Sequence, residues 1–518
     1  MKRFFALFLT AALYAAAAVA AVPAGASAKP APHKMVSVPP ATPAAVTEHT
    51  IELGGQVIHY TARAGTITLR NQADQPTARI FYVAYTEDGS DLTRRPVTFL
   101  YNGGPGSSTM WLHMGAFGPV HVVTGDGTIT GPPPYRIVTN PNSLLNKTDL
   151  VFIDMPDTGF GRIVGAGKPK DFFGVDQDAR AFAQFVQRYI TQFDRWNSPK
   201  FIFGESYGTT RSAALAAVLQ QDGIALNGVV LQSSILNFNL DWNQNFGYKA
   251  ATIGGGDWGF VLYLPTEAAT AWYHHKVTYR GSLQSFLKTV QHFAMGEYLG
   301  ALAKGDSLSG PEYNDVVRKL HEYTGLSEQY IKDSHLRIQY GRFEKALLRN
   351  QGKIVGRLDS RFETYTLDPE SASAQWDPTD SAIDAAYTTA VNQYIRQTLK
   401  YNPPISYRSS AYAIIHKNGG WDWKHDGQTT TNVAVDLAET MVINPHLQVF
   451  SANGYYDFAT PYLATVYTLS HLNLPPALQK HITYGFYKSG HMIYLNPASL
   501  VRYRSDLDRW YDRVLSGR

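Results

Sequence analysis

The stretch Lys200-Phe201-Ile202-Phe203-Gly204-Glu205-Ser206-Tyr207-Gly208 decides how the rest of this chain is interpreted. Its first four residues form a short apolar run typical of a buried strand, and small residues typical of a helix follow at 209–219. The G-x-S-x-G pattern between them predicts a sharp strand-to-helix turn that exposes the Ser206 hydroxyl. Gly204 and Gly208 flank the serine because side chains there would collide in so tight a turn. The flanking strand and helix favour a nucleophile over the alternative, a chance match in a Ser/Gly-rich loop.

Two segments near the C-terminus supply the partners that a nucleophilic serine needs. A strand pattern at 447–450 leads into a loop that ends at Asp457, and one at 481–487 leads into the loop that carries His491. The order serine, acid, histidine is that of the α/β-hydrolases. Both loops leave the carboxyl end of a strand, where open parallel sheets bind ligands. We expect His491 to be the base and Asp457 its orienting partner, although a turn or helix-cap aspartate remains an alternative for Asp457.

A glycine-rich loop provides the third element of this predicted chemistry. The apolar strand pattern at 97–101 ends in NGGPGSS at 102–108. Adjacent glycines allow the backbone to approach a ligand and to direct N–H groups at it. Together with the N–H of Tyr207, the residue after the serine, this loop is expected to stabilise an oxyanion. Taken alone, the loop could equally be a plain Gly/Pro turn.

Five blocks in the same order together resemble the serine carboxypeptidase family (peptidase family S10). They are NGGPGSS at 102–108, DLVFIDMPDTGF at 149–160, GESYG at 204–208, NGYYD at 453–457 and SGHM at 489–492, and the likeness extends from about residue 48 to about residue 500. The resemblance implies an α/β-hydrolase fold and a peptidase that releases C-terminal residues. It also implies roles for individual residues: Ser206 as nucleophile, His491 as general base and acid, Asp457 as its partner, Gly104 and Tyr207 as oxyanion donors, and Asn102, Gly103 and Glu205 as the groups that bind the substrate carboxylate.

A carboxylate held beside Glu205 implies a shared proton, because close like charges raise one pKa. We therefore expect activity to be favoured at mildly acidic pH. The chain also departs from the family pattern. Ser107 stands where eukaryotic members carry a cysteine, and Ala116 stands where a second carboxylate-binding glutamate is usual. Since acyl chemistry does not fix the leaving group, an esterase or acyltransferase on the same scaffold stays open, as does a non-catalytic binding protein.

Composition indicates an exported globular protein. The 518 residues are 44% hydrophobic, enough for a large core, and the formal charge of +4 includes no dense Lys/Arg run, which argues against a nucleic-acid partner. Residues 1–28 combine Lys2-Arg3, an apolar run and Ala26-Ser27-Ala28, which predicts a cleaved signal peptide, with an uncleaved anchor as the alternative. The absence of cysteine favours a bacterial periplasmic or secreted protein.

Spacing predicts the organisation of the chain. A Pro/Ala-rich linker is expected at 29–46, the first part of an α/β-hydrolase core at 47–237, a mainly helical cap insertion at 238–442 and the second part of the core at 443–518. Alternating residues at 48–101 predict antiparallel strands, and patterns near 97–101, 149–154, 200–204 and 228–233 predict a mostly parallel central sheet. Apolar stripes after Ser282, after Pro311 and from Ile383 predict cap helices. No metal-ligand or nucleotide motif is present, so we expect no cofactor, and the sequence leaves the oligomeric state open.

Overall fold

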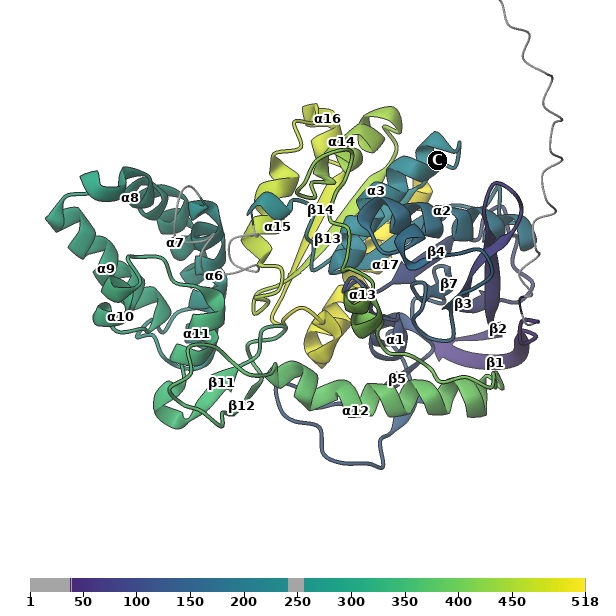
Figure 1. The fold of residues 1–518 in the computed structure, drawn as a ribbon, viewed down its shortest axis with the longest axis horizontal. Coiled ribbons are helices and arrows are strands. Elements are labelled where there is room, and N and C mark those ends of the chain that lie inside the picture. The colour runs from purple at the N-terminus through teal and green to yellow at the C-terminus, as the bar shows by residue number, and fades with distance from the viewer. Residues whose placement is uncertain (1–37, 39, 241–255, 518) are drawn as a thin grey trace, which may run out of the picture. The chain divides into compact units, whose positions relative to one another are not determined.

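A computed structural model describes residues 38, 40–240 and 256–517 of the chain (Figure 1). The predicted signal peptide at 1–28 lies outside these residues, as do residues 29–37 of the predicted linker. None of the helices in the described ranges combines the length and the apolar character that a membrane crossing requires.

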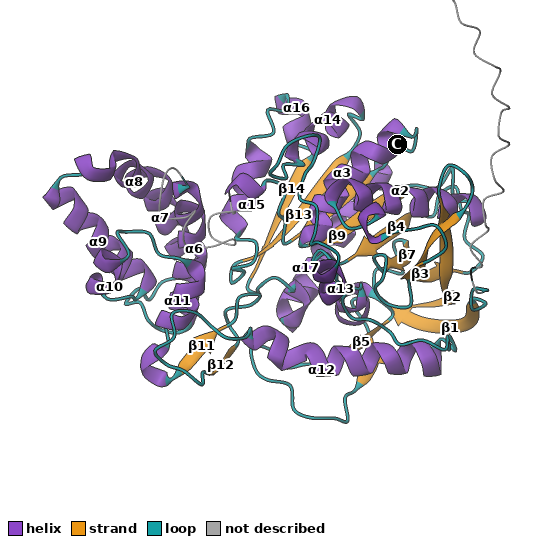
Figure 2. Cartoon of the chain, viewed as in Figure 1, coloured by secondary structure: helices purple, strands orange, loops and turns teal. Residues whose placement is uncertain are grey.

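The central sheet is mixed at its N-terminal side and parallel over the rest (Figure 2). The pairs β1–β2, β2–β3 and β3–β7 are antiparallel, whereas every following pair from β7–β4 to β13–β14 is parallel. The predicted mostly parallel sheet is therefore confirmed. In spatial order the strands are β1 (Ala45–Leu53), β2 (Gln56–Arg70), β3 (Pro76–Glu87), β7 (Asp149–Ile153), β4 (Val97–Tyr101), β9 (Lys200–Glu205), β10 (Gly228–Gln232), β13 (Gln448–Gly454) and β14 (Ile482–Tyr487), with β8 (Arg162–Ile163) paired to β3.

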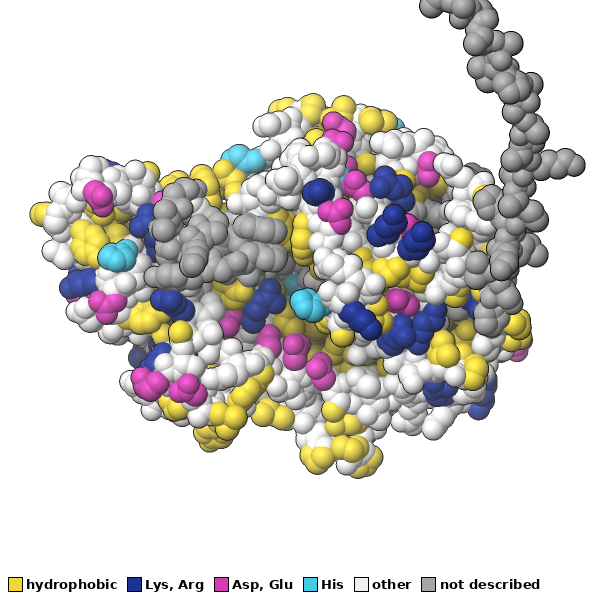
Figure 3. Space-filling view, in the orientation of Figure 1, with side chains coloured by type: hydrophobic (Ala, Val, Ile, Leu, Met, Phe, Trp, Pro, Cys, Tyr) yellow, Lys and Arg dark blue, Asp and Glu magenta, His cyan; other side chains and the backbone are white. Residues whose placement is uncertain are grey.

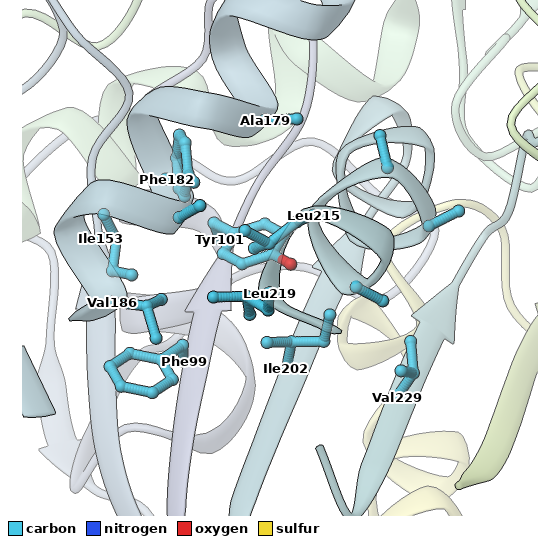
Figure 4. Packing of buried hydrophobic residues seen from close by; sticks show 14 of the residues in the cluster. Phe99, Tyr101, Ile153, Ala179, Phe182, Val186, Ile202, Leu215, Leu219 and Val229 are labelled. Atoms are coloured by element: carbon cyan, nitrogen blue, oxygen red, sulfur yellow. The ribbon is translucent and has the colours of Figure 1, made fainter. Parts of the chain in front are cut away.

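One face of the sheet is covered by α2 (Val175–Gln192), α3 (Tyr207–Gln221) and α14 (Ala434–Ile443). Strand side chains such as Phe99 and Ile202 interdigitate there with Phe182 and Leu215 of the helices (Figure 4). Full burial of side chains of this size contributes about 1.5–3 kcal/mol each. This packed layer holds the carboxyl ends of the parallel strands at fixed relative positions.

The opposite face is covered by helices from three distant parts of the chain. A second buried cluster lies on this face. It contains residues of α1 (Met110–Leu112), η1 (His113–Phe117), α12 (Pro378–Gln393) and α17 (Pro497–Ser516). Phe201 of β9 packs edge-on against Trp510 of α17, with ring centroids 5.7 Å apart. Because α12 joins this cluster, one helix of the predicted cap insertion is part of the wall beside the sheet.

The helices between 257 and 346 form an apolar cluster of their own, which also takes in residues of α15 (Tyr462–Ser470). Two predicted helices are confirmed here with their caps. Ser282 Oγ accepts from the Ser285 N–H at the start of α7, and α9 opens with a Ser309/Glu312 capping box and ends at Gly325, whose φ is 70°. The cluster's helices are α6 (Asp257–Tyr273), α7 (Leu283–Phe293), α8 (Leu299–Lys304), α9 (Gly310–Thr324), α10 (Glu328–Asp333) and α11 (Tyr340–Ala346).

The third predicted helix is confirmed as α12, but α12 and α14 pack on the two faces of the sheet although both fall inside the predicted insertion at 238–442. The division of the chain into domains stays a prediction. The other elements are short: the ribbons β5 (Val120–Val122) with β6 (Ile137–Thr139) and β11 (Lys353–Val355) with β12 (Glu363–Tyr365), the helices α13 (Tyr412–Lys417) and α16 (Pro476–Gln479), and η2 (Pro169–Asp171), η3 (Ala294–Tyr298), η4 (Gly305–Ser307), η5 (Arg349–Gln351), η6 (Tyr394–Thr398) and η7 (Ile493–Leu495).

Candidate active site

Ser206 occupies a strained turn between β9 and α3, as the sequence predicts. Its φ of 61° and ψ of −132° are unusual for a residue with a side chain, and such positions cost about 1–3 kcal/mol. A Cβ at Gly204 would clash with the carbonyl oxygen of Gly208, and a Cβ at Gly208 would come within 2.9 Å of the carbonyl oxygen of Tyr101, which explains why both flanking positions are glycine. The Ser206 N–H donates to the carbonyl of Gln232 on the neighbouring strand at 3.0 Å. The turn is therefore braced by the sheet while the serine side chain projects from it.

Asp457 and His491 meet just beyond the ends of two paired strands. Asp457 follows β13, His491 follows β14, and these strands run parallel, so their carboxyl ends lie at one edge of the sheet. His491 Nδ1 lies 2.9 Å from Asp457 Oδ2. The other carboxylate oxygen accepts the backbone N–H groups of Ala459 and Thr460 at 2.8 and 3.0 Å. The carboxylate is thus fully buried yet well supplied with hydrogen-bond donors.

The environment of His491 adjusts its basicity in two opposing ways. Burial lowers the pKa of the imidazole, but the charge and hydrogen bond of Asp457 and the charge of Glu205 together leave the pKa above its ordinary value of 6.5. An aspartate that fixes Nδ1 as the protonated nitrogen leaves Nε2 available as a base.

A single cavity of about 910 Å³ brings together the residues that the sequence singled out. Ser206 and His491 both line this cavity, and Asp457 lies behind His491. The predicted oxyanion and carboxylate-binding residues also line it, namely Asn102, Gly103, Gly104, Glu205 and Tyr207. Sequence positions separated by up to 389 residues (from 102 to 491) therefore share one chamber.

The glycine loop lies directly against the N-terminus of α3. A Cβ on Gly103 would come within 2.5 Å of the backbone nitrogens of both Tyr207 and Gly208. Gly104 has a φ of 109°, a conformation that L side chains rarely adopt. The first turn of a helix carries unpaired N–H groups and a partial positive charge. This arrangement suits a site where negative charge develops beside Ser206.

Glu205 borders the cavity but is only 2% exposed. Its two oxygens accept from Asn102 Nδ2 at 2.6 Å and from Gln232 Nε2 at 2.7 Å. Burial raises the pKa of this carboxyl to about 7, although the charge of His491 acts in the opposite direction. A neutral Glu205 can donate a hydrogen bond to a carboxylate, whereas an ionised one would repel it. Glu205 is therefore suited to bind an anion at mildly acidic pH.

Several residues of the site carry no sequence signal. Thr460 Oγ1 donates to Asp457 Oδ2 at 2.7 Å and lies 3.2 Å from His491 Nδ1. The loop of His491 is held by the segment before β12, because its backbone N–H donates to Leu358 and the N–H of Gly490 donates to Asp359 at 3.0 Å. Residue 359 lies more than 100 positions before this loop and belongs to no recognisable motif, so only the folded chain shows the connection.

The cavity has two chemically different walls that the sequence analysis missed. One is aromatic and apolar and consists of Tyr207, Ile235, Phe238, Trp421 and Trp423. The other belongs to α12 and presents Asp380, Asp384 and Thr388. Ala116, at the place of the family's second glutamate, is buried in η1.

Comparisons with known proteins identify the family of the chain. The model of the family described as "Serine carboxypeptidase" matches residues 56–490. Pheromone-processing carboxypeptidase KEX1 of Saccharomyces cerevisiae is 32% identical over 157 residues, which cover 28% of this chain and 20% of the relative. Carboxypeptidase S1 of Penicillium janthinellum is 31% identical over 135 residues, 25% of this chain and 28% of the relative. The chain therefore aligns with only about a fifth to a quarter of the length of these curated relatives.

A solved structure extends the likeness to the fold. The crystal structure of a prohormone-processing carboxypeptidase from Saccharomyces cerevisiae aligns with 88% of this chain and 91% of that chain, with a TM-score of 0.51 and 16% identity. Together with the order of strands and the turn at Ser206, this match establishes an α/β-hydrolase fold. Because the family model spans most of its length, the chain belongs to the serine carboxypeptidase family.

Proposed function

We propose that this protein is a serine-type carboxypeptidase that releases residues from the C-terminus of peptides. The observation that carries the proposal is the buried Asp457–His491 hydrogen bond in the same cavity as the strained Ser206. In this proposal Ser206 Oγ attacks the scissile carbonyl and His491 Nε2 accepts its proton. His491 then returns the proton to the leaving amine, and water hydrolyses the acyl-enzyme in a second passage through the same steps.

The negative charge of the tetrahedral intermediate needs donors that are already in place. The N–H groups of Gly104 and Tyr207 are assigned this role because the glycine loop abuts the start of α3. Removing one such donor typically lowers the rate roughly 100- to 1,000-fold.

Selection of a chain end is assigned to Asn102, Gly103 and Glu205. The C-terminal carboxylate of the substrate would accept from this group, with Glu205 in its protonated form. Because that carboxyl has a pKa of about 7, the proposal links end selection to mildly acidic conditions.

We further propose that the protein is bacterial and is exported to the periplasm or secreted. The support is the basic, apolar and small-residue succession at residues 1–28 and the absence of cysteine. N-terminal sequencing of the mature protein would yield Lys29 as the first residue if the predicted cleavage occurs.

The function is tested with a peptide and its C-terminally amidated twin. Mass spectrometry should show stepwise loss of C-terminal residues from the free peptide and slow turnover of the amide, with no turnover by Ser206→Ala. Equal rates on the two peptides would contradict carboxylate recognition and favour an esterase or acyltransferase. Failure of a fluorophosphonate probe to label Ser206 would contradict the nucleophile and favour a non-catalytic binding protein.

A further inference from the structure

Two aspartates on α12 form an acidic wall of the catalytic cavity. Asp380 and Asp384 are four positions apart, so their side chains project from the same face of the helix, and both line the cavity. Figure 3 shows a group of acidic side chains at the edge of a hollow, over the N-terminal part of α12. We call these two residues the α12 aspartates.

Within the described residues, neither α12 aspartate has a cationic side chain within 4.0 Å, and no hydrogen-bond donor contacts either carboxylate. Asp377, the third acid of this wall, differs because it accepts the backbone N–H groups of Leu358 and Thr379 at 2.9 and 2.8 Å. The N-terminus of α12 favours an acid at Asp380, which lies in the first turn, but Asp384 lies beyond that turn.

The positive charges near the α12 aspartates do not balance the negative charge of the neighbouring carboxyls. Burial and the neighbouring aspartates raise the pKa of Asp380 to about 7, against smaller opposing effects of Arg357 and His491. Burial, followed by the charge of Asp377, raises the pKa of Asp384 to about 6. Arg357 also lines the cavity, with its Nε 3.3 Å from the Tyr340 hydroxyl. A cation bound beside these two carboxyls would favour their ionised form and so lower both pKa values.

The α12 aspartates share the cavity with the proposed carboxylate site, and the same helix also carries a residue near Glu205. Tyr387, three residues after Asp384, stacks at a tilt on Trp111 with ring centroids 5.0 Å apart, and Trp111 lines the cavity. Tyr387 is close enough to Glu205 for that charge to raise the pKa of the phenol. The indole of Trp111 thus offers an apolar surface in the cavity that holds both the carboxylate site and the α12 aspartates, suited to an alkyl chain that ends in a charge.

A second observation supports entry of the substrate here, since the same cavity contains the strained Ser206 and the His491–Asp457 pair. We propose that Asp380 and Asp384 recognise the cationic side chain of a lysine or arginine at the C-terminus of the peptide substrate. This inference rests on the proposed function and adds the substrate class to it. The released product would then be a basic amino acid.

The test uses N-acylated dipeptides, in which the N-terminal α-amine is blocked and cannot compete with the side chain for the acids. The acyl-Phe-Lys peptide is compared with acyl-Phe-norleucine, which keeps the alkyl chain and lacks the charge, and with acyl-Phe-Glu. We expect kcat/KM for lysine to exceed that for norleucine by about 10-fold, which corresponds to ~1.4 kcal/mol, and glutamate to be the poorest substrate. In Asp380→Asn/Asp384→Asn the lysine-to-norleucine ratio should fall to about 1.

Glu439→Gln is the matched control, because it removes an exposed acid of α14 that does not line the cavity, and it should keep the wild-type ratio. Hydrolysis of norleucine and lysine peptides at equal rates by the wild type would overturn the acidic-wall proposal and leave the carboxypeptidase intact. An unchanged ratio in the double variant would do the same. If the wild type cleaves none of the dipeptides, the proposed function fails and this inference fails with it.

Discussion

Glu205 allows a prediction in which the structure supplies the magnitude. Glu205→Gln replaces a titratable group with a neutral one of the same shape. The substitution can be accommodated, because Gln232 Oε1 has no hydrogen-bond partner and Gln232 can rotate its amide so that this oxygen accepts from the new side chain. The change therefore tests the proton on residue 205 more than it tests packing.

The expected effect follows from the pKa of about 7 that burial imposes on Glu205. Protonated Glu205 binds a substrate carboxylate and ionised Glu205 repels it, so binding is favoured below this pKa and lost above it. At pH 9 only roughly 1% of the group is protonated, and kcat/KM for a free acid should fall about 100-fold from its value near pH 6, apart from the titration of His491.

The assay removes the contribution of His491 by taking a ratio. An N-acylated dipeptide and its C-terminal amide require the same base, so the ratio of their kcat/KM values reports only on recognition of the carboxylate. In the wild type this ratio should decline about 10-fold per pH unit above pH 7, and in Glu205→Gln it should not change with pH. A wild-type ratio that stays constant from pH 5 to pH 9 would refute the assignment of Glu205.

Three further predictions concern the nucleophile, its partners and the aromatic wall. Ser206→Ala should lower turnover by roughly a million-fold, and Ser206→Gly should be more stable to urea than Ser206→Ala by about 1 kcal/mol, because glycine tolerates a φ of 61°; equal stabilities would argue against backbone strain. Asp457→Asn should lower kcat by about 10,000-fold with little change in KM, because the asparagine stabilises the wrong imidazole tautomer. A much smaller fall in kcat, measured by steady-state kinetics, would contradict this role of Asp457. His425, whose pKa is raised to about 9 mainly by its hydrogen bond to Asp436, ties the chain segment that carries Trp421 and Trp423 to the core. The rise of this pKa from 6.5 to about 9 corresponds to roughly 3.4 kcal/mol, which screening by water reduces. His425 should therefore add about 2 kcal/mol of stability below pH 6.5 that disappears as the pH rises through 9, and thermal unfolding of His425→Gln should show no such loss.

The strands of the parallel sheet could be predicted because each is a short, continuous apolar run. The patterns at 97–101 and 200–204 correspond to β4 and β9 within one residue. Such strands are buried on both faces, so their composition is nearly independent of what packs on them. The roles of α12 and α14 were not predictable in this way. The apolar stripe from Ile383 predicts the α12 helix, but a stripe does not say which surface it will cover, and no pattern was identified for α14.

The residues of the candidate site also fall into a group that the sequence predicts and a group that it does not. Ser206, Asp457 and His491 lie on loops whose position relative to a strand can be read along the chain, and the pairing of β13 with β14 then brings Asp457 and His491 within 2.9 Å. Thr460 and Asp359 have no local pattern to mark them. Asp359 accepts from the N–H of Gly490, 131 positions away, and the Thr460 hydroxyl lies 3.2 Å from His491 Nδ1, 31 positions away. These partners are near only once the chain has folded.

The order of strand, loop and helix along the chain determined the fold class and the chemistry, because strained turns and glycine loops are local and need only a few neighbouring residues. Tertiary structure alone decided what surrounds that chemistry. The acids of α12, the tryptophans at 421 and 423 and the anchor at Asp359 come from segments with no common motif. Their position depends on the packing of whole helices against the sheet, and packing energy is shared among many distant side chains instead of being encoded in a short stretch.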